Sequence, residues 1–477
     1  MDLRVETHFA PLAVDLDGTL IATDLLWEAM VALLKRNPLY IFLLPYWAFL
    51  GPYALKIKLA ERVDLAVATL PYRTDFLAFL RSEHAKDRKL VLATASPLKF
   101  AQQVASHLGI FESVLASADG INLSSKRKAA ALNSLFGQAG YDYAGNSRAD
   151  LAVFESARAS IIVAPDRAAA AYQAQTESLL FPAATRGARP IFKMLRMHQW
   201  AKNVLIAVPA VLANELDRPA TLSAVGLAFV AFCLAASAIY ILNDLIDLPL
   251  DRRHATKSKR SIASGAVSIP MAISISFALA LASVSIALFL PLQFQLVLGG
   301  YAVLTTAYSF ALKRMLLIDV LTLAGLYTVR VVAGAAATQI DVSFWLLAFS
   351  VFFFLSLALV KRFVELEQAP ADTASKVAGR GYRAADKHVI AEAGMASTFA
   401  SALVLALYID SGEVQKLYGS PWLIWPLCPI VLYLSIRIWV LARRGEMHED
   451  PVVFLLSDWR SVMMVGVGAA LIFGASF

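Results

Sequence analysis

From about Asn203 onward, the sequence is a series of long apolar runs separated by short polar segments. Such runs can cross the roughly 30 Å hydrocarbon core of a bilayer as helices, which satisfy their own backbone polar groups. We expect an all-α membrane bundle of nine spans, at about 203–214, 221–243, 268–289, 292–311, 317–338, 343–361, 394–410, 421–441 and 459–476.

The composition divides the chain into two parts. Of its 477 residues, 58% are hydrophobic and 17% are charged, whereas a soluble domain is ordinarily about half apolar and a quarter charged. The excess lies in the second part, because the first 200 residues or so resemble a soluble protein. We expect a soluble domain over about 1–185 and a membrane domain over about 186–477.

The basic residues predict the orientation of the chain. Lys and Arg gather on one side of the expected spans, and the other side has little beyond Arg218 and Lys416. Because cytoplasmic loops are enriched in these residues, we expect a multi-pass protein of a bacterial inner membrane with a cytoplasmic N-terminal domain. The net charge of +7 then suits a membrane surface and anionic substrates, and not a nucleic acid.

The first 185 residues alternate between predicted strands and helices, which indicates an α/β domain. Strands are expected at Leu12–Asp15, Lys89–Thr94 and Ser160–Val163, and a helix at Leu98–Leu108. A helical insert, or cap, should occupy about 25–80. Within it, the apolar stretch 39–55 is interrupted by two prolines and has three interpretations: a buried cap helix, an interfacial segment resting on the bilayer, or a tenth span.

Two carboxylates follow the first expected strand. In AVDLDGTL, Asp15 and Asp17 stand one residue apart, so that they can share a divalent ion while one attacks phosphorus and the other moves a proton. Further polar side chains follow in order along the chain. Thr94 and Lys128 are candidates to hold a phosphoryl group, and Asn146 and Asp150 are candidate metal ligands.

These four ordered motifs resemble the haloacid dehalogenase superfamily over roughly residues 10 to 170. The resemblance implies a Rossmann-like phosphatase that uses Mg²⁺, with Asp15 as nucleophile and Asp17 as general acid and base. Asn146 stands where many members have an acid, which leaves open whether the domain is an active phosphatase or a regulatory one. The phosphate-binding role assigned to Lys128 is also open to Lys126.

The loop after the second expected span carries a second acidic motif. A helical spacing of four places Asn243, Asp247 and Asp251 on one face, where their oxygen atoms suit magnesium and, through it, a diphosphate. Acidic side chains at the end of a span are costly unless they coordinate something. The cations that follow are Arg253, Lys257 and Arg260.

This motif and the many spans resemble the UbiA superfamily of intramembrane prenyltransferases over roughly residues 190 to 477. The resemblance implies that Asn243, Asp247 and Asp251 hold metal, and that the two aspartates take part in catalysis. The loop after the sixth span departs from the usual aspartate-rich pattern because it is cationic. Its basic residues are Lys361, Arg362, Arg380 and Arg383.

Cations at that position suit direct phosphate binding. Together with QWAKN, YSFALKR and RVVAGA, they resemble the branch that transfers phosphoribose from phosphoribosyl diphosphate to decaprenyl phosphate. The resemblance adds Lys202, Tyr308, Lys313 and Arg330 as substrate-binding candidates. The attached phosphatase would then remove the terminal phosphate of the lipid-linked product. The alternative is a conventional prenyltransferase that joins a prenyl diphosphate to an aromatic or other acceptor.

Overall fold

The computed structural model describes residues 9–183, 187–368, 381–447 and 450–476. The chain forms two compact units. The first comprises Met1–Leu195 together with Ile241–Ser274, and the second comprises Arg196–Tyr240 and Ile275–Phe477. The segment Ile241–Ser274 therefore packs with the N-terminal domain, although it lies between two apolar helices of the chain.

The first unit is built on a six-stranded sheet in the order β3-β2-β1-β4-β5-β6, in which every neighbouring pair is parallel. The expected strands and the α/β fold are confirmed. The strands are β1 Leu12–Val14, β2 Leu90–Pro97, β3 Ser113–Ser117, β4 Asp142–Gly145, β5 Ala159–Val163 and β6 Leu179–Phe181.

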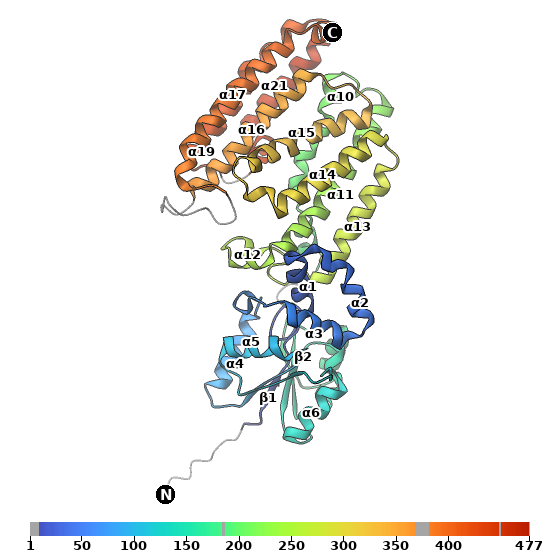
Figure 1. Ribbon diagram of the computed structural model, residues 1–477, viewed down its shortest axis with the longest axis vertical. Helices are drawn as coiled ribbons and strands as arrows, with labels where there is room; N and C mark the ends of the chain where they lie inside the picture. The colour runs from blue at the N-terminus through green and yellow to red at the C-terminus, as the bar shows by residue number, and fades with distance from the viewer. Residues whose placement is uncertain (1–8, 184–186, 369–380, 448–449, 477) are drawn as a thin grey trace. The chain divides into compact units, whose positions relative to one another are not determined.

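Helices cover both faces of this sheet (Figure 1). Successive side chains of a strand point to opposite faces, so Leu12 and Val14 enter one core with Phe100, whereas Ala13 enters a second core with Leu132. Burial on both faces explains why these strands read as continuous apolar runs. The helices that follow the strands are α5 Leu98–Leu108, α6 Lys126–Phe136, α7 Leu151–Phe154 and α8 Arg167–Gln173.

The insert between β1 and β2 is the expected helical cap. Asp24 begins its first helix by accepting a hydrogen bond from the Leu26 backbone at 2.8 Å, as an N-cap residue does. The cap consists of α1 Leu25–Arg36, η1 Pro38–Phe42, α2 Leu44–Phe49, α3 Pro52–Arg62, η2 Val67–Thr69 and α4 Thr74–His84.

A buried ion pair connects the segment Ile241–Ser274 to this cap. The segment includes the end of α11 (Pro219–Ile246), α12 (Leu248–Arg253), η5 (Lys257–Lys259) and the start of α13 (Ile269–Ala287). Arg252 donates to Glu28 of α1 at 2.7 and 3.1 Å, and both side chains are buried. Gly265 has φ +75°, and a Cβ there would lie 2.3 Å from the Ala22 carbonyl oxygen, so only glycine fits without displacing the backbone.

Six helices of the described chain are long and apolar enough to cross a membrane, or up to seven spans if the bent pair α20 and α21 is one. A multi-pass helical bundle is thus supported, but nine spans are not confirmed. The six candidates are Pro219–Ile246, Ile269–Ala287, Ile318–Thr338, Phe344–Glu367, Ala384–Ile409 and Pro421–Arg443, and the bent pair is Pro451–Ser457 with Trp459–Ala475.

The two remaining expected spans differ from the prediction for separate reasons. The stretch 203–214 is divided between η4 (Met197–Ala207) and the short α10 (Val208–Leu212), neither of which is long enough to cross a bilayer. The stretch 292–311 is a helix, α14 (Leu292–Phe310), but its glutamines, glycines and hydroxyl-bearing residues make it less apolar than the other candidates.

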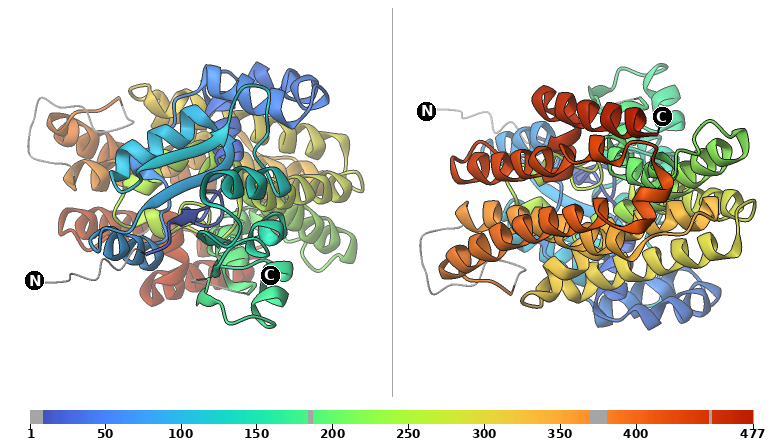
Figure 2. Two further views of the ribbon diagram at one scale, coloured as in Figure 1. Left: turned by 90° about the horizontal axis from the view of Figure 1, so that it is seen from below. Right: turned by 90° about the horizontal axis from the view of Figure 1, so that it is seen from above.

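Close packing joins the long helices of the second unit. The neighbours α15 (Ile318–Thr338), α16 (Phe344–Glu367), α17 (Lys387–Ile409) and α19 (Leu427–Arg443) contact one another in turn, and the right-hand view of Figure 2 shows the orange and red helices side by side. A Cβ at Gly394 would lie 1.9 Å from the Trp439 ring. Small residues at such crossings let membrane helices approach closely. The other helices are α9 Arg189–Leu195, in the first unit, and α18 Gly412–Leu417.

Candidate functional site

A pocket of about 510 Å³ in the first unit contains the predicted phosphatase residues. In a parallel sheet, side chains that follow the carboxyl ends of the strands meet at one edge. This edge brings together the segment that follows β1, the segment that follows β4 and the C-terminal half of β2. Asp15, Asp17, Lys128, Asn146 and Asp150 all line the pocket, so five predicted residues from three parts of the sequence share one opening.

Asp15 is held by a buried lysine. Lys128 Nζ donates to Asp15 at 2.7 Å and to Asp150 at 3.3 Å, and it also contacts the Tyr143 hydroxyl at 2.9 Å. Burial raises the pKa of Asp15 to about 7, although Lys128 opposes the shift. Burial opposes protonation of Lys128, yet the two carboxylates raise its pKa. This geometry favours Lys128 over Lys126 as the cation of the site.

Asp17 is anchored by the loop that starts the cap. It accepts from the Leu25 backbone N–H at 2.8 Å and from Ser96 Oγ at 2.7 Å. The Thr94 hydroxyl also lies 3.4 Å from the carboxylate of Asp17. Burial raises the pKa of Asp17 to about 6, which suits a group that gives and takes a proton.

Asn146 and Asp150 belong to a loop with a defined conformation. Asp150 accepts from the backbone N–H groups of Asn146 and Ser147, each at 3.1 Å. Burial opposes ionisation, yet Lys128 and these hydrogen bonds lower the pKa of Asp150. Asn146 accepts from Thr19 Oγ1 at 3.3 Å, and its side chain lies against Gly18, where a Cβ would come within 2.2 Å. Gly18, at φ +77°, is therefore required for Asn146 to approach Asp15 and Asp17.

The donor set of this pocket suits Mg²⁺. No three His, Cys, Asp or Glu side chains among the described residues are grouped closely enough to form a metal cluster by themselves. Mg²⁺, however, is ordinarily held by one or two carboxylates, and water and substrate oxygens complete its shell. Asp15, Asp17 and the amide oxygen of Asn146 provide that kind of set.

Other residues of the pocket were not predicted from the sequence. Ser96 binds Asp17, and Lys56 of α3 reaches in from the cap, where it donates to the Ala95 carbonyl at 2.6 Å. One wall consists of Gly265, Ser268, Ile269 and Pro270, which stand more than 240 positions after Asp15. No local motif marks them. Because α13 begins at Ile269, the wall includes the first turn of a candidate membrane span.

The second acidic motif is arranged differently from the prediction of one continuous helical face. The helix α11 ends at Ile246, and Asp247 precedes α12. Arg260 Nη1 contacts Asp251 at 2.5 Å and Asp244 at 3.1 Å, and both of these aspartates are buried. The sequence prediction included Asn243, which is half-buried, and omitted Asp244.

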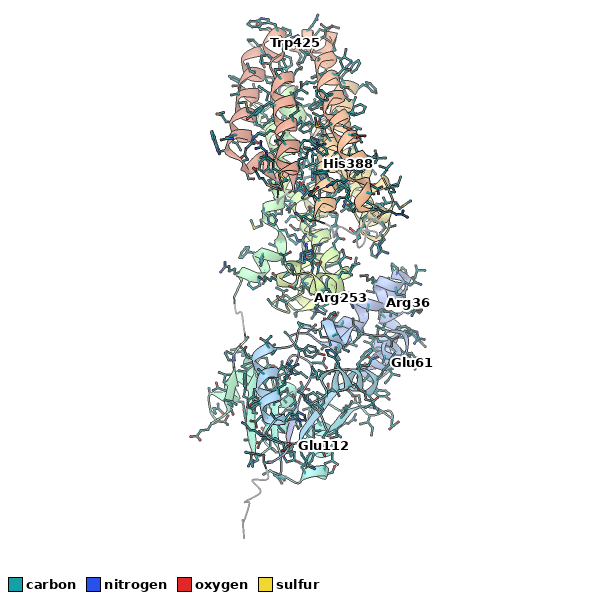
Figure 3. The ribbon with its side chains drawn as sticks, turned by 90° about the vertical axis from the view of Figure 1, so that its left-hand side faces the viewer. Arg36, Glu61, Glu112, Arg253, His388 and Trp425 are labelled. Atoms are coloured by element: carbon teal, nitrogen blue, oxygen red, sulfur yellow. The ribbon has the colours of Figure 1, made fainter. Side chains whose placement is uncertain are left out.

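The other motif residues lie nearer to solvent. Asp247 is half-buried, and its backbone N–H donates to the Asn243 carbonyl at 2.9 Å. Arg253, labelled in Figure 3, and Lys257 are exposed. The buried part of this motif is therefore a pair of carboxylates bridged by one arginine.

The second unit contains a buried polar network centred on Asp450. The Asp450 carboxylate accepts three contacts. Lys202 Nζ lies 2.8 Å from it, Lys361 Nζ lies 3.1 Å from it, and the Tyr327 hydroxyl donates to it at 2.9 Å. The Asp450 side chain is only 8% exposed. The two lysines were predicted from motifs 159 residues apart in the sequence, whereas Asp450 and Tyr327 were not. The acid stands alone after an expected cytoplasmic loop and has no motif around it.

Arg330 extends this network on the side of Lys202. Its Nε donates to the Asn203 side chain at 2.8 Å, and its guanidinium lies 5.1 Å from the Tyr301 ring centroid and 5.8 Å from that of Tyr327. Lys202 Nζ lies 5.6 Å from the same Tyr327 ring. Tyr327 thus links the lysine and the arginine, and both are buried.

The remaining predicted cations do not share one environment. Arg362 is fully buried and pairs with Asp319 at 2.6 Å and with Glu365, whereas Arg383 is exposed. Tyr308 and Lys313 are half-buried at the end of α14 and in the turn after it. Arg380 lies outside the described residues.

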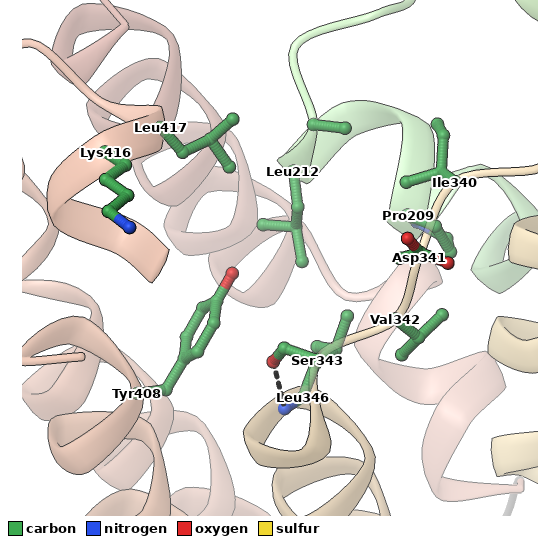
Figure 4. A pocket seen from close by; sticks show the side chains of 11 residues that line it. Pro209, Leu212, Ile340, Asp341, Val342, Ser343, Leu346, Tyr408, Lys416 and Leu417 are labelled. Atoms are coloured by element: carbon green, nitrogen blue, oxygen red, sulfur yellow. Dashed lines mark hydrogen bonds between the residues drawn. The ribbon is translucent and has the colours of Figure 1, made fainter. Parts of the chain in front are cut away.

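A separate pocket of about 360 Å³ in the second unit contains none of the predicted residues (Figure 4). Its walls are mostly apolar side chains such as Leu212 and Leu346, and Ser343 uses its hydroxyl to accept from the Leu346 backbone at 3.1 Å. The polar groups Asp341 and Lys416 also line it. Among the described residues that line it, Lys416 is the one Lys or Arg, so this pocket does not offer a cluster of cations to a phosphate group.

Two family models match the chain. Residues 203–458 match the UbiA prenyltransferase family, and residues 12–155 match the haloacid dehalogenase-like hydrolases. The first match covers more than half of the 477 residues. It contains the acidic motif, Lys361 and Asp450, and it begins at Asn203, one residue after Lys202.

Curated relatives cover one or both parts. The uncharacterized protein y4nM of Sinorhizobium fredii is 37% identical over 96% of this chain and 89% of its own length. Nodulation protein NoeC of Azorhizobium caulinodans is 32% identical over 58% of this chain and 91% of its own. A decaprenyl-phosphate phosphoribosyltransferase of Mycobacterium tuberculosis is 36% identical over 38% of this chain and 61% of its own.

Proposed function

Because this chain belongs to the UbiA prenyltransferase family and carries a haloacid dehalogenase-like domain, we propose that it is a transferase acting on polyprenyl phosphate, with an attached phosphatase. The group transferred is 5-phosphoribose, and the donor is phosphoribosyl diphosphate. We place the protein in a bacterial inner membrane with the phosphatase in the cytoplasm.

The observation that carries this proposal is the buried cationic network of the second unit. Lys202 and Arg330 are buried beside one buried carboxylate, Asp450, and Lys361, whose side chain is 35% exposed, contacts the same carboxylate from the edge of the network. Burying more positive than negative charge is costly unless an anion completes the site. Both substrates of phosphoribosyl transfer are anions, and the similarity to decaprenyl-phosphate phosphoribosyltransferases supports the same choice.

In the transfer step, an oxygen of the lipid phosphate attacks the anomeric carbon of the donor. The bond from that carbon to the diphosphate breaks, and the diphosphate leaves with the electron pair. The buried cations hold phosphate groups and so keep the reacting atoms close together. Asp244, Asp247, Asp251 and Asn243 offer the oxygen ligands that Mg²⁺ prefers, and bound Mg²⁺ would neutralise charge on the departing diphosphate.

The lipid-linked product carries a terminal phosphomonoester, which is a substrate for the first unit. Asp15 attacks phosphorus, and Asp17 gives its proton to the leaving ribose oxygen. Water then hydrolyses the aspartyl phosphate, and Asp17 takes the proton back. The wall at Ser268–Pro270 supports a lipid-linked substrate, because it is the first turn of a candidate membrane span.

The decisive experiment uses purified full-length protein with magnesium in two mixtures. One contains labelled phosphoribosyl diphosphate and polyprenyl phosphate, and the other contains labelled prenyl diphosphate and aromatic acids. We expect label in the lipid fraction of the first mixture, followed by release of inorganic phosphate. Label incorporated only in the second mixture would assign the chain to conventional prenyl transfer, which is the alternative that the family allows.

A further inference from the structure

The cap of the first unit exposes a continuous run of large apolar side chains. No charged residue occurs between Arg36 and Lys56. Phe42 is 77% exposed, Tyr46 59% and Phe49 90%. The other exposed members of this surface, which we call the apolar platform, are Leu39, Ile41, Leu43 and Leu50.

The platform is one face of a folded segment and not a loosely packed stretch. Its opposite face is buried, because Trp47 lies in the core of the unit and Tyr40 and Leu44 pack against that core. The Tyr40 and Trp47 rings are 5.9 Å apart, and the Arg62 guanidinium lies 5.0 Å from the Trp47 ring centroid. The inner side chains thus hold η1 and α2 in place while the outer ones remain without cover.

Soluble proteins rarely expose seven large apolar side chains in one short segment unless a partner covers them. Two observations favour a bilayer as the partner. The platform follows α1 directly, and Glu28 of α1 is paired with Arg252 of α12, which lies in the segment between candidate spans α11 and α13. The cap is therefore paired with a stretch of chain that continues at each of its ends into a candidate membrane span.

The second observation is the composition of the platform and its edges. Aromatic and aliphatic side chains are exposed together, and basic residues precede them at Lys35 and Arg36, the latter labelled in Figure 3. Interfacial segments combine such an apolar face with flanking cations that meet anionic lipid headgroups. The segment is too short to cross the hydrocarbon core.

We infer that the apolar platform of the cap inserts into the headgroup and acyl boundary of the membrane that the chain itself spans. It thereby holds the phosphatase pocket at the bilayer surface, where a lipid-linked phosphate is presented. The insertion itself does not depend on the proposed transfer reaction.

The test places a nitroxide label on full-length protein in nanodiscs of phosphatidylcholine and phosphatidylglycerol. Cys233 and Cys428 are first replaced by alanine, and Phe49→Cys provides the labelling site. Leu135→Cys, on α6, is the matched control because Leu135 is a 58% exposed apolar residue of the same unit. We expect the label at Phe49 to collide several-fold more often with oxygen, and less often with a water-soluble nickel chelate, than the label at Leu135.

Two results would overturn the inference. Equal accessibility at the two positions would place Phe49 in water, and strong dipolar coupling between labels of two copies would assign the platform to self-association. A charge variant gives an independent check, because Tyr46→Glu should lower oxygen collisions at a Phe42→Cys label, whereas Ile121→Glu should leave them unchanged. These outcomes are independent of transferase activity, so failure here leaves the proposed function standing.

Discussion

Glu28 and Arg252 are 224 residues apart in the sequence, yet they form a buried, two-point ion pair in the first unit. Glu28 also accepts from Thr23 Oγ1 at 2.7 Å, in the loop that connects Asp17 to the cap. Arg252 stands next to Asp251 of the acidic motif. The pair thus joins the segment that carries the acidic motif to the loop that leads from Asp17 into the cap.

Glu28→Ala and Arg252→Ala should each destabilise the contact between α1 and α12. Removing one partner leaves the other as an uncompensated buried charge, which costs about 3–5 kcal/mol. We expect faster amide hydrogen exchange in both helices for each variant, and a smaller effect in the double variant than the sum of the two. Glu61→Gln is the control, since its ion pairs are exposed and should contribute less than about 1 kcal/mol. Additive effects of the two substitutions would show that the charges are independent.

Gly265→Ala should impair the phosphatase by displacing one wall of its pocket. A Cβ at this position would meet the Ala22 backbone at 2.3 Å, so the loop must move. We expect kcat/KM to fall more for a lipid-linked phosphate than for p-nitrophenyl phosphate, which does not need the wall. Gly120→Ala is the control, because Gly120 also has a positive φ, +80°, but a Cβ added there would have no atom within 4 Å. It therefore separates the effect of backbone strain from the effect of the steric clash. Equal losses in the two variants would contradict a role for the wall.

The two catalytic sites should fail separately. Asp15→Asn removes the proposed nucleophile, so phosphate release from the lipid-linked product should stop while label still enters the lipid. Asp247→Asn should abolish that incorporation and leave hydrolysis of p-nitrophenyl phosphate unchanged. The measurement is a time course of labelled lipid and of inorganic phosphate for each variant. Loss of transfer in Asp15→Asn would mean that the sites are not independent.

Asp450→Asn should lower transfer by about 10²-fold or more, because the lysines at 202 and 361 lose the carboxylate that positions them. Asp341→Asn is the matched control, since Asp341 lines the pocket of about 360 Å³ in the second unit, which is apart from the Asp450 network. We expect the initial rate of labelled lipid formation to fall in the first variant alone. A comparable loss of transfer in Asp341→Asn would contradict a specific role for Asp450 and would assign substrate binding to the pocket that Asp341 lines.

Removal of divalent cations should stop both reactions. Both acidic sites offer carboxylates suited to Mg²⁺, and without the ion the phosphate oxygens keep their full charge repulsion against these acids. We expect a chelator to abolish transfer and phosphate release, and added magnesium to restore them. Persistent phosphate release in the chelator would show that Lys128 alone neutralises the phosphatase site.

Much of the chemistry was accessible from local patterns. Asp15, Asp17, Lys128 and Asp150 line one pocket, and Thr94 lies 3.4 Å from Asp17, because the carboxyl ends of parallel strands lie at one edge of a sheet. The roles assigned to these residues stay predictions. The sequence also identifies the acidic motif, but it does not predict which of the motif's side chains face each other. Helical spacing selected Asn243, whereas the end of α11 at Ile246 allows Asp244 and Asp251 to share Arg260. A break in a helix changes which side chains face each other, and no hydrophobic pattern marks this break.

The amino-acid pattern alone predicts the class of each part, because long apolar runs form helices in a bilayer and short apolar runs that alternate with helices form a parallel sheet with helical cover. The contacts between residues far apart in the sequence could be read from the three-dimensional packing alone. Asp450 joining Lys202, the pair between the cap and α12, and the wall at Gly265 all arise from packing of distant segments. Sequence periodicity reports which face of an element is buried, but it carries no information about which element buries it.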